Sequence, residues 1–264
     1  MDSGLAIETH ALTRLFDGRP AVADLDLRVP AGAFYGFLGP NGAGKSTTMK
    51  MLTGLLRPTA GTARVLGLEL AGDALEVKSR IGVVPDGLAL FERLSGEEML
   101  RIQGQLYGLP RAEAGRRAGE LLEALDLAPE RGKLVQAYSH GMKKKLALGC
   151  ALIHGPRLLF LDEPFEGIDA IAVAGIRSML QELVAHRSLT IFLTSHVLEV
   201  VERLVTHVGI IHRGRLVAQG TLEEVRARGS LEETFIRIVG DEPRAARGLS
   251  WLGAGPGGGT PGAG

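Results

Sequence analysis

The pattern of apolar and polar residues divides the chain into an alternating region and a region of short apolar runs. The segment VADLDLRV (22–29) alternates strictly, which predicts a half-buried antiparallel strand with Leu25, Leu27 and Val29 facing inward. Five later runs are mostly apolar and end in turn residues or charges: AFYGFL (33–38), IGVV (81–84), LLFL (158–161), LTIFL (189–193) and HVGII (207–211). Such runs are typical of strands buried on both faces of a parallel sheet.

Amphipathic helical stretches lie between several of these runs, for example at 170–186 and 197–204. The alternation of strands and helices predicts a doubly wound α/β core over residues 1–87 and 154–242, which starts with a small antiparallel β region. Residues 88–153 interrupt the alternation with helical periodicity and no strand candidate, so they predict an inserted all-helical subdomain. The tail 243–264 is so rich in glycine that we expect it to be disordered.

Composition and charge narrow the function classes. The 30 Lys and Arg residues balance 30 Asp and Glu residues, and basic residues are scattered except at 143–145, so no nucleic-acid partner is expected. The single cysteine, Cys150, lies in an apolar stretch and is expected to be a small buried hydrophobe in a reducing compartment. The sequence has neither a signal-peptide pattern nor an apolar stretch long enough to span a membrane, so we expect any membrane role to come through a partner.

The strongest chemical motif is GPNGAGKST, which lies between the apolar run 33–38 and a helical stretch. It matches the phosphate-loop pattern, in which glycines let successive N–H groups point into one concavity at the positive end of a helix. Lys45 can reach the β and γ phosphates, the Ser46 hydroxyl can ligate Mg²⁺, and Thr47 can bond a phosphate oxygen. The predicted nucleotide-binding residues are Gly39, Pro40, Asn41, Gly42, Ala43, Gly44, Lys45, Ser46 and Thr47. The fold class is therefore α/β with a phosphate-loop NTPase core.

Two further strand ends carry polar residues that suit phosphate chemistry. The run RLLFLDEP (157–164) ends in Asp162 and Glu163, which can divide the work: Asp162 holds Mg²⁺ and Glu163 polarises the attacking water. A charged cap on a strand end is the alternative. His196 follows the run 189–193 and can hydrogen-bond the γ phosphate, although a lone histidine is also a common core or surface residue. No histidine pair has zinc-ligand spacing, so no transition-metal site is predicted.

The ordered combination of these motifs over residues 5–240 resembles the nucleotide-binding subunit of ATP-binding-cassette (ABC) transporters. The family's Leu-Ser-Gly-Gly-Gln signature maps onto YSHGM (138–142), where only Ser139 and Gly141 match. The resemblance implies that two cassettes pack head to tail, with each ATP between one chain's phosphate loop and Ser139 and Gly141 of the other. We expect Lys143, Lys144 and Lys145 to form a largely solvated helix face.

The resemblance assigns four more positions. Phe16 aligns with the aromatic residue that stacks on adenine, Asp169 with the aspartate that links the two sites across the dimer, and His196 with the switch histidine. Asp86 stands where the family usually has a glutamine that touches Mg²⁺ and the attacking water and marks the loop that senses the transmembrane partner. The Asp86 carboxylate can still bind Mg²⁺, but it adds negative charge beside the γ phosphate.

By resemblance, the expected function is an ATPase subunit that uses ATP and Mg²⁺, with Lys45, Glu163 and His196 as its catalytic groups. Its expected partners are a second cassette, identical or different, and a polytopic membrane permease that holds it at the cytoplasmic face of the membrane; the pattern is most similar to exporter cassettes. The alternative is a soluble cassette ATPase acting on ribosomes or DNA, but such relatives carry two cassettes or long coiled-coil insertions, and this chain carries neither. A phosphate-loop kinase or GTPase does not account for Ser139, Gly141, Asp169 or His196.

Overall fold

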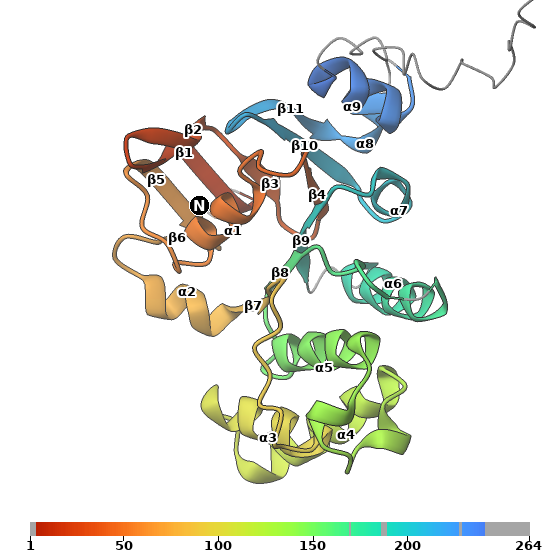
Figure 1. Cartoon of the computed structure of the whole chain (residues 1–264). Coiled ribbons are helices and arrows are strands. Elements are labelled where there is room, and N and C mark those ends of the chain that lie inside the picture. Colours follow the sequence, from red (N-terminus) through yellow and green to blue (C-terminus); the bar gives the residue numbers. More distant parts are fainter. Residues whose placement is uncertain (1–3, 169, 186–188, 227–228, 241–264) are drawn as a thin grey trace, which may run out of the picture.

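The computed structural model describes residues 4–168, 170–185, 189–226 and 229–240, and it contains two sheets (Figure 1). The larger sheet has the strand order β11-β10-β4-β9-β8-β7. Its members are β4 (Phe34–Leu38), β7 (Ile81–Val84), β8 (Leu158–Asp162), β9 (Thr190–Ser195), β10 (His207–His212) and β11 (Arg215–Thr221). The first five pair in parallel and β11 closes one edge antiparallel to β10, so all five apolar runs are confirmed as parallel strands.

Both faces of the parallel sheet are buried, as the apolar runs predict. Along β8, Leu159 and Leu161 pack into one hydrophobic cluster with helical side chains, whereas Leu158 and Phe160 pack into a second cluster on the opposite face. Successive side chains of a strand point to opposite faces, so a strand covered on both sides needs apolar residues at every position. The carboxyl ends of these strands are thereby held at one rigid edge of the core.

The N-terminal sheet is antiparallel, as predicted, but its strands differ from the expected one. The sheet is built on β1 (Leu5–Phe16), which pairs with β2 (Arg19–Leu25), β3 (Arg28–Pro30) and β5 (Ala60–Val65), and β6 (Leu68–Glu69) follows β5. The segment 22–29 is therefore not one strand but parts of β2 and β3.

Side-chain hydrogen bonds explain the break between β2 and β3. Asp26 Oδ1 accepts from Ala11 N at 2.7 Å, and Thr9 Oγ1 accepts from Leu27 N at 2.8 Å, so side chains replace ladder partners at this point. The inward direction of the leucines and the valine is confirmed, because Leu25, Leu27 and Val29 are fully buried.

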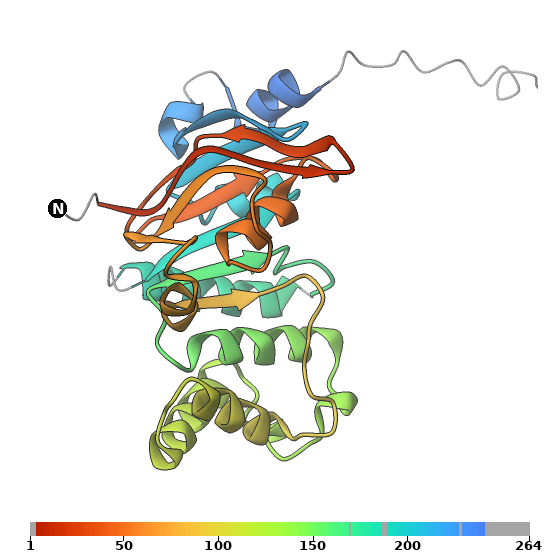
Figure 2. The same ribbon diagram turned by 90° about the vertical axis from the view of Figure 1, so that its left-hand side faces the viewer.

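Three helices and two short 3₁₀ turns lie between β7 and β8, below the sheets in Figure 2. They are α3 (Gly96–Leu106), α4 (Arg111–Ala124) and α5 (His140–Leu152), and the fully described range 88–153 contains no strand. Helix α5 packs against the sheet so closely that a Cβ on Gly82 of β7 would lie 2.2 Å from Ala151 O. Cys150 of α5 is buried, as predicted, and burial raises the pKa of its thiol to about 12.

The remaining helices flank the sheets. They are α1 (Lys45–Leu52), α2 (Ala74–Arg80), α6 (Ala170–Ala185), α7 (Leu198–Glu202), α8 (Leu222–Arg226) and α9 (Leu231–Val239), so the helices expected at 170–186 and 197–204 are present. None of the helices in the described ranges is both long and apolar enough to cross a membrane. The glycine-rich tail 243–264 lies outside the described residues, and the domain limits at 88 and 153 stay a prediction.

Candidate functional site: a nucleotide pocket at the sheet edge

The phosphate loop connects β4 to α1 and requires glycine where it passes close to other backbone. A Cβ on Gly39 would lie 2.4 Å from Ile211 O of β10. Gly44, which precedes α1, has φ 110°, and a Cβ there would lie 2.7 Å from Ala21 O of β2. Left-handed backbone and contacts this short both exclude larger residues, so these glycines let the loop lie tightly against the two strands.

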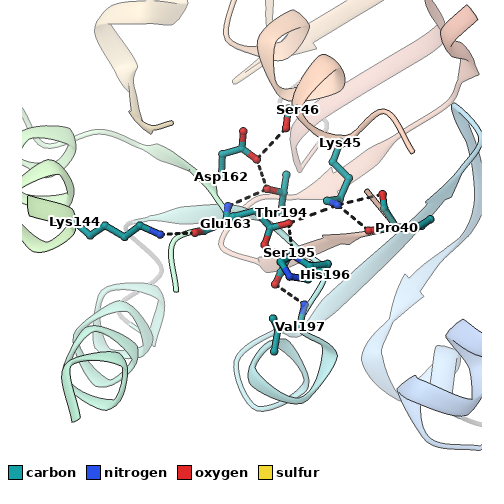
Figure 3. A network of polar contacts seen from close by, with 11 residues as sticks. Pro40, Lys45, Ser46, Lys144, Asp162, Glu163, Thr194, Ser195, His196 and Val197 are labelled. Atoms are coloured by element: carbon teal, nitrogen blue, oxygen red, sulfur yellow. Dashed lines mark hydrogen bonds and ion pairs between the residues drawn. The ribbon is translucent and has the colours of Figure 1, made fainter. Parts of the chain in front are cut away.

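Lys45, the first residue of α1, is held across the loop (Figure 3). Its Nζ donates to Gly39 O at 2.8 Å and to Pro40 O at 3.4 Å, and it lies 3.5 Å from Glu163 Oε1. The side chain is only 6% exposed, so the ammonium is fixed by these oxygens instead of by water. A positive charge is thereby held at the N-terminal end of α1, where the helix dipole also favours a phosphate.

Asp162 ends β8 and forms an oxygen cluster with α1 and β9. Its Oδ1 accepts from Thr194 Oγ1 at 2.5 Å and from Ser46 Oγ at 3.4 Å, and the residue is 7% exposed. Carboxylate and hydroxyl oxygens suit Mg²⁺, which takes few protein ligands and completes its shell with phosphates and water. Within the described ranges no three His, Cys, Asp or Glu side chains gather into a metal cage. The residues present therefore fit Mg²⁺.

Glu163 follows Asp162 in a left-handed conformation, with φ 47°. This conformation costs roughly 1–2 kcal/mol for a residue with a side chain, so neighbouring groups must hold it. Glu163 N donates to Thr194 O and Thr194 Oγ1, both at 3.2 Å. Its carboxylate meets His196 Nδ1 at 3.0 Å and Lys45 at 3.5 Å. The sharp turn thus aims Glu163 back at the phosphate loop.

Lys45, Ser46, Glu163 and His196 line one polar cavity of about 500 Å³, whereas Asp162 and Thr194 are not among its lining residues. It is lined by Ala21, Asn41, Gly42, Gly44, Lys45, Ser46, Thr47, Asp86, Glu163, Glu166 and His196. Six residues from the predicted loop therefore meet Glu163, His196 and Asp86 in one place, although these residues come from four separate stretches of the chain. Glu166 is a lining residue that the motifs did not indicate.

Three other predicted site residues lie elsewhere. Phe16 ends β1 with 45% of its surface exposed and does not line the cavity; the Arg14 guanidinium lies 4.7 Å from its ring centroid. Ser139 and Gly141 begin α5, where Ser139 Oγ accepts from Met142 N at 3.2 Å, and neither of them lines the cavity. Asp169 lies outside the described residues.

The expected solvated lysine face is wrong for Lys144. Its side chain is only 5% exposed, and its Nζ donates to the main-chain carbonyls of Glu163, at 3.0 Å, and Glu166. Lys143 and Lys145 are also partly covered, with side chains 24% and 13% exposed, but they form ion pairs with Glu92 and Asp126. Helical spacing does not single out Lys144, since Lys143 also lies four and seven positions before buried residues, Ala147 and Cys150.

The comparisons with known proteins agree with this geometry. The sequence pattern of the ABC transporter family matches residues 22–166. The chain is 40% identical over 233 residues to the daunorubicin/doxorubicin resistance ATP-binding protein DrrA of Streptomyces peucetius, covering 88% of this chain and 70% of that protein. It is 38% identical over 222 residues to the bacitracin transport ATP-binding protein BcrA of Bacillus licheniformis, covering 84% and 72%.

A solved structure titled as the ATP binding subunit of an ABC transporter superposes with a TM-score of 0.82 at 32% identity, covering 88% of this chain and 99% of that one. Its fold matches the sheets and helices described above, and the family pattern spans the stretch from β2 to Glu166 that supplies most of the cavity lining. The chain therefore belongs to the ABC transporter family, as an ATP-binding subunit and an ATPase.

Proposed function

We propose that this chain hydrolyses ATP with Mg²⁺ at a seam between two cassettes, and that the reaction drives transport through a separate membrane permease. One observation carries the proposal: Lys45, Glu163 and His196 converge on one open cavity from three different elements of the core. A polyphosphate that enters this cavity meets the N-terminus of α1 and the Lys45 ammonium.

Each residue has a distinct part in the proposed reaction. Lys45 binds the β and γ phosphates, and Ser46 and Asp162 hold Mg²⁺, which when bound neutralises phosphate charge. Glu163 accepts the proton of the water that attacks the γ phosphorus. His196 keeps Glu163 in place through the 3.0 Å contact and can donate a hydrogen bond to the γ phosphate. Thr194 fixes the positions of both carboxylate residues, because its Oγ1 donates to Asp162 Oδ1 and accepts from Glu163 N.

The second half of the site is proposed to come from another cassette. Ser139 is exposed and caps the N-terminus of the 13-residue helix α5, so free N–H groups near Gly141 can face a γ phosphate from outside the chain. Phe16 is exposed at the end of β1 and offers a ring for adenine stacking. Asp86 lines the cavity on an exposed loop after β7, and we place the contact that senses the permease on this loop.

The permease and the membrane location are supported by the names of the relatives, one of which is a bacitracin transport protein and another a resistance protein. Resistance to a toxic compound is most directly obtained by export, so we propose a polytopic exporter as the partner and the cytoplasmic face of the membrane as the location. The balanced charge of the chain gives no support to a soluble cassette that acts on ribosomes or DNA.

The seam between two cassettes makes turnover depend on protein concentration. The rate of ATP hydrolysis per chain is expected to rise from near zero, where analytical ultracentrifugation shows monomers, to a plateau where it shows dimers, because a monomer lacks the second half of the site. If the second cassette is a different chain, the isolated protein should stay monomeric and inactive until that chain is added. Equal turnover per chain in strictly monomeric and in dimeric samples would contradict the proposal that ATP is hydrolysed between two cassettes.

The proposed permease can be identified by isolating the tagged chain from membrane extract in mild detergent. Mass spectrometry of the bound material is expected to find a polytopic membrane protein in amounts comparable with the chain. The matched control is the same chain with the tag at its other end, because partners that bind through the tag are then recovered differently from partners that bind the chain. Recovery of ribosomal proteins in place of a membrane protein would favour the alternative function.

A further inference from the structure

Lys144 lies outside the phosphate loop and is buried beside the candidate site. Its hydrogen-bond partners are main-chain carbonyl oxygens. Lys144 reaches from α5 to the turn after β8, where its Nζ donates to Glu163 O at 3.0 Å (Figure 3). The same Nζ also donates to Glu166 O. The turn between these two residues is also closed by Glu166 N, which donates to Glu163 O at 3.3 Å. One ammonium therefore links both ends of the turn that carries the proposed base.

The surroundings of Lys144 favour a fixed position. Its side chain borders a cavity of about 10 Å³, which is otherwise lined by Val84, Leu148, Leu161, Pro164 and Ile176. A space of this size holds at most about one water molecule, so the carbonyl oxygens are the main partners of the ammonium. Burial lowers the pKa of Lys144, while the nearby carboxylates of Glu166, Asp86 and Glu163 act in the opposite direction.

The hydrogen bonds from Lys144 complete the support of the left-handed Glu163. The N–H of Glu163 is bound by Thr194 of β9, and its carbonyl is bound by Lys144 of α5, so both sides of the residue are held from different elements. Removal of one of these partners frees the turn to relax toward an ordinary conformation, which rotates the Glu163 side chain away from the cavity. Small displacements of a catalytic base have large effects on rate.

We propose that Lys144 is a positioning residue for ATP hydrolysis, which sets the direction of the Glu163 carboxylate by holding the main chain of residues 163–166. This inference rests on the proposed role of Glu163 as the base. Lys144 lies on α5, the helix that Ser139 caps. The same helix therefore carries Ser139 and Gly141, which are proposed to contact the partner's nucleotide, and Lys144, which is proposed to position Glu163 of its own chain.

The test compares Lys144→Met with Lys145→Met in the intact chain. Methionine retains the apolar stem of lysine but donates no hydrogen bond, and Lys145 is one position further on the same helix, where it pairs with Asp126 at 3.4 Å. Lys144→Met is expected to lower kcat at least tenfold and to change the KM for ATP less than threefold, because Lys144 does not line the cavity. Lys145→Met should retain the parent kcat, and Lys144→Arg should recover most of it.

A second measurement separates positioning from loss of structure. In a Glu163→Gln background, Lys144→Met is expected to cause no further loss of the residual turnover, measured with radiolabelled ATP, because the base that it positions is already absent. If Lys144→Met does not fold, Lys144→Gln, which keeps an N–H donor of shorter reach, replaces it and should lower kcat at unchanged KM. A parent kcat in the variant, or an equal fractional loss in both backgrounds, would overturn the inference.

The same data distinguish this inference from the proposed function. If Glu163→Gln turns over ATP at the parent rate, the proposed base is wrong and the role of Lys144 is lost with it. If Glu163→Gln is inactive but Lys144→Met is fully active, the proposed function stands and only the positioning role of Lys144 is wrong.

Discussion

Glu163→Gln is expected to lower kcat for ATP hydrolysis by at least about 10²-fold, within the range that loss of a general base produces. The glutamine amide has nearly the same shape as the carboxylate but cannot accept the proton of the attacking water. ATP binding is expected to be retained or strengthened, because the amide no longer competes with phosphate for the Lys45 ammonium, which lies 3.5 Å from Glu163 Oε1. Turnover by phosphate release and affinity by a fluorescent ATP analogue measure the two effects separately.

The matched control is Glu199→Gln on α7, an exposed carboxylate that pairs with Arg203 at 3.1 Å and is three residues beyond His196. It should leave both kcat and ATP affinity within about twofold, since an exposed ion pair contributes roughly 0–1 kcal/mol. Turnover of Glu163→Gln at the parent rate would show that another group is the base. A large loss of ATP affinity would show instead that Glu163 acts in binding.

Lys45→Ala is expected to weaken ATP binding by about 10²-fold, which corresponds to about 2.8 kcal/mol at a tenfold change per 1.4 kcal/mol. The reason is the loss of charge-assisted hydrogen bonds to the phosphates, together with the repulsion that an unopposed Glu163 carboxylate then exerts on them. Because Lys45 also donates to Gly39 O and Pro40 O, the loop should become less ordered as well. Titration calorimetry at fixed salt and Mg²⁺ concentration measures the affinity.

Lys50→Ala is the control for this loss of charge, because Lys50 is an exposed lysine near the end of the same helix. It should bind ATP as the parent does. An unchanged affinity in Lys45→Ala, with an unchanged melting temperature, would mean that the phosphates bind elsewhere on the chain.

The parallel sheet was predictable because its strands are covered on both faces. All five residues of β8 are buried, and the four before Asp162 are apolar, which makes the strand visible as an apolar run in the sequence. The phosphate loop was predictable for a similar reason, since Gly39 and Gly44 occupy positions where a Cβ would collide with main-chain atoms. In both cases the local environment permits very few residue types.

The features that were not predicted depend on contacts between distant segments. The strand expected at 22–29 is divided because Thr9 and Asp26 supply hydrogen bonds at the break, and alternation of apolar residues continues across it. Burial of Lys144 was missed because a triplet of lysines does not reveal which one faces the protein. That choice is made by the packing of α5 on β7 and by carbonyl groups 19 and 22 residues later in the chain.

Some residues of the candidate site could likewise be predicted from sequence motifs, and others could not. Sequence motifs identify Lys45, Asp162 and Glu163, whereas the contact between His196 and Glu163, and the lining position of Glu166, require the strand order β4-β9-β8. Ser139 lies at the start of α5 and does not line the cavity of its own chain, so the partner site proposed for it rests on the family resemblance.

The placement of α5 has a consequence for communication inside a dimer. Ser139 and Lys144 are five residues apart on one helix, a rise of about 7.5 Å at 1.5 Å per residue. If a neighbouring molecule's triphosphate pulls on the first turn of α5, the helix tilts as a stiff lever and its ammonium shifts the turn at Glu163. In the proposed dimer, occupancy of one site would thereby change the geometry of the other through α5 alone.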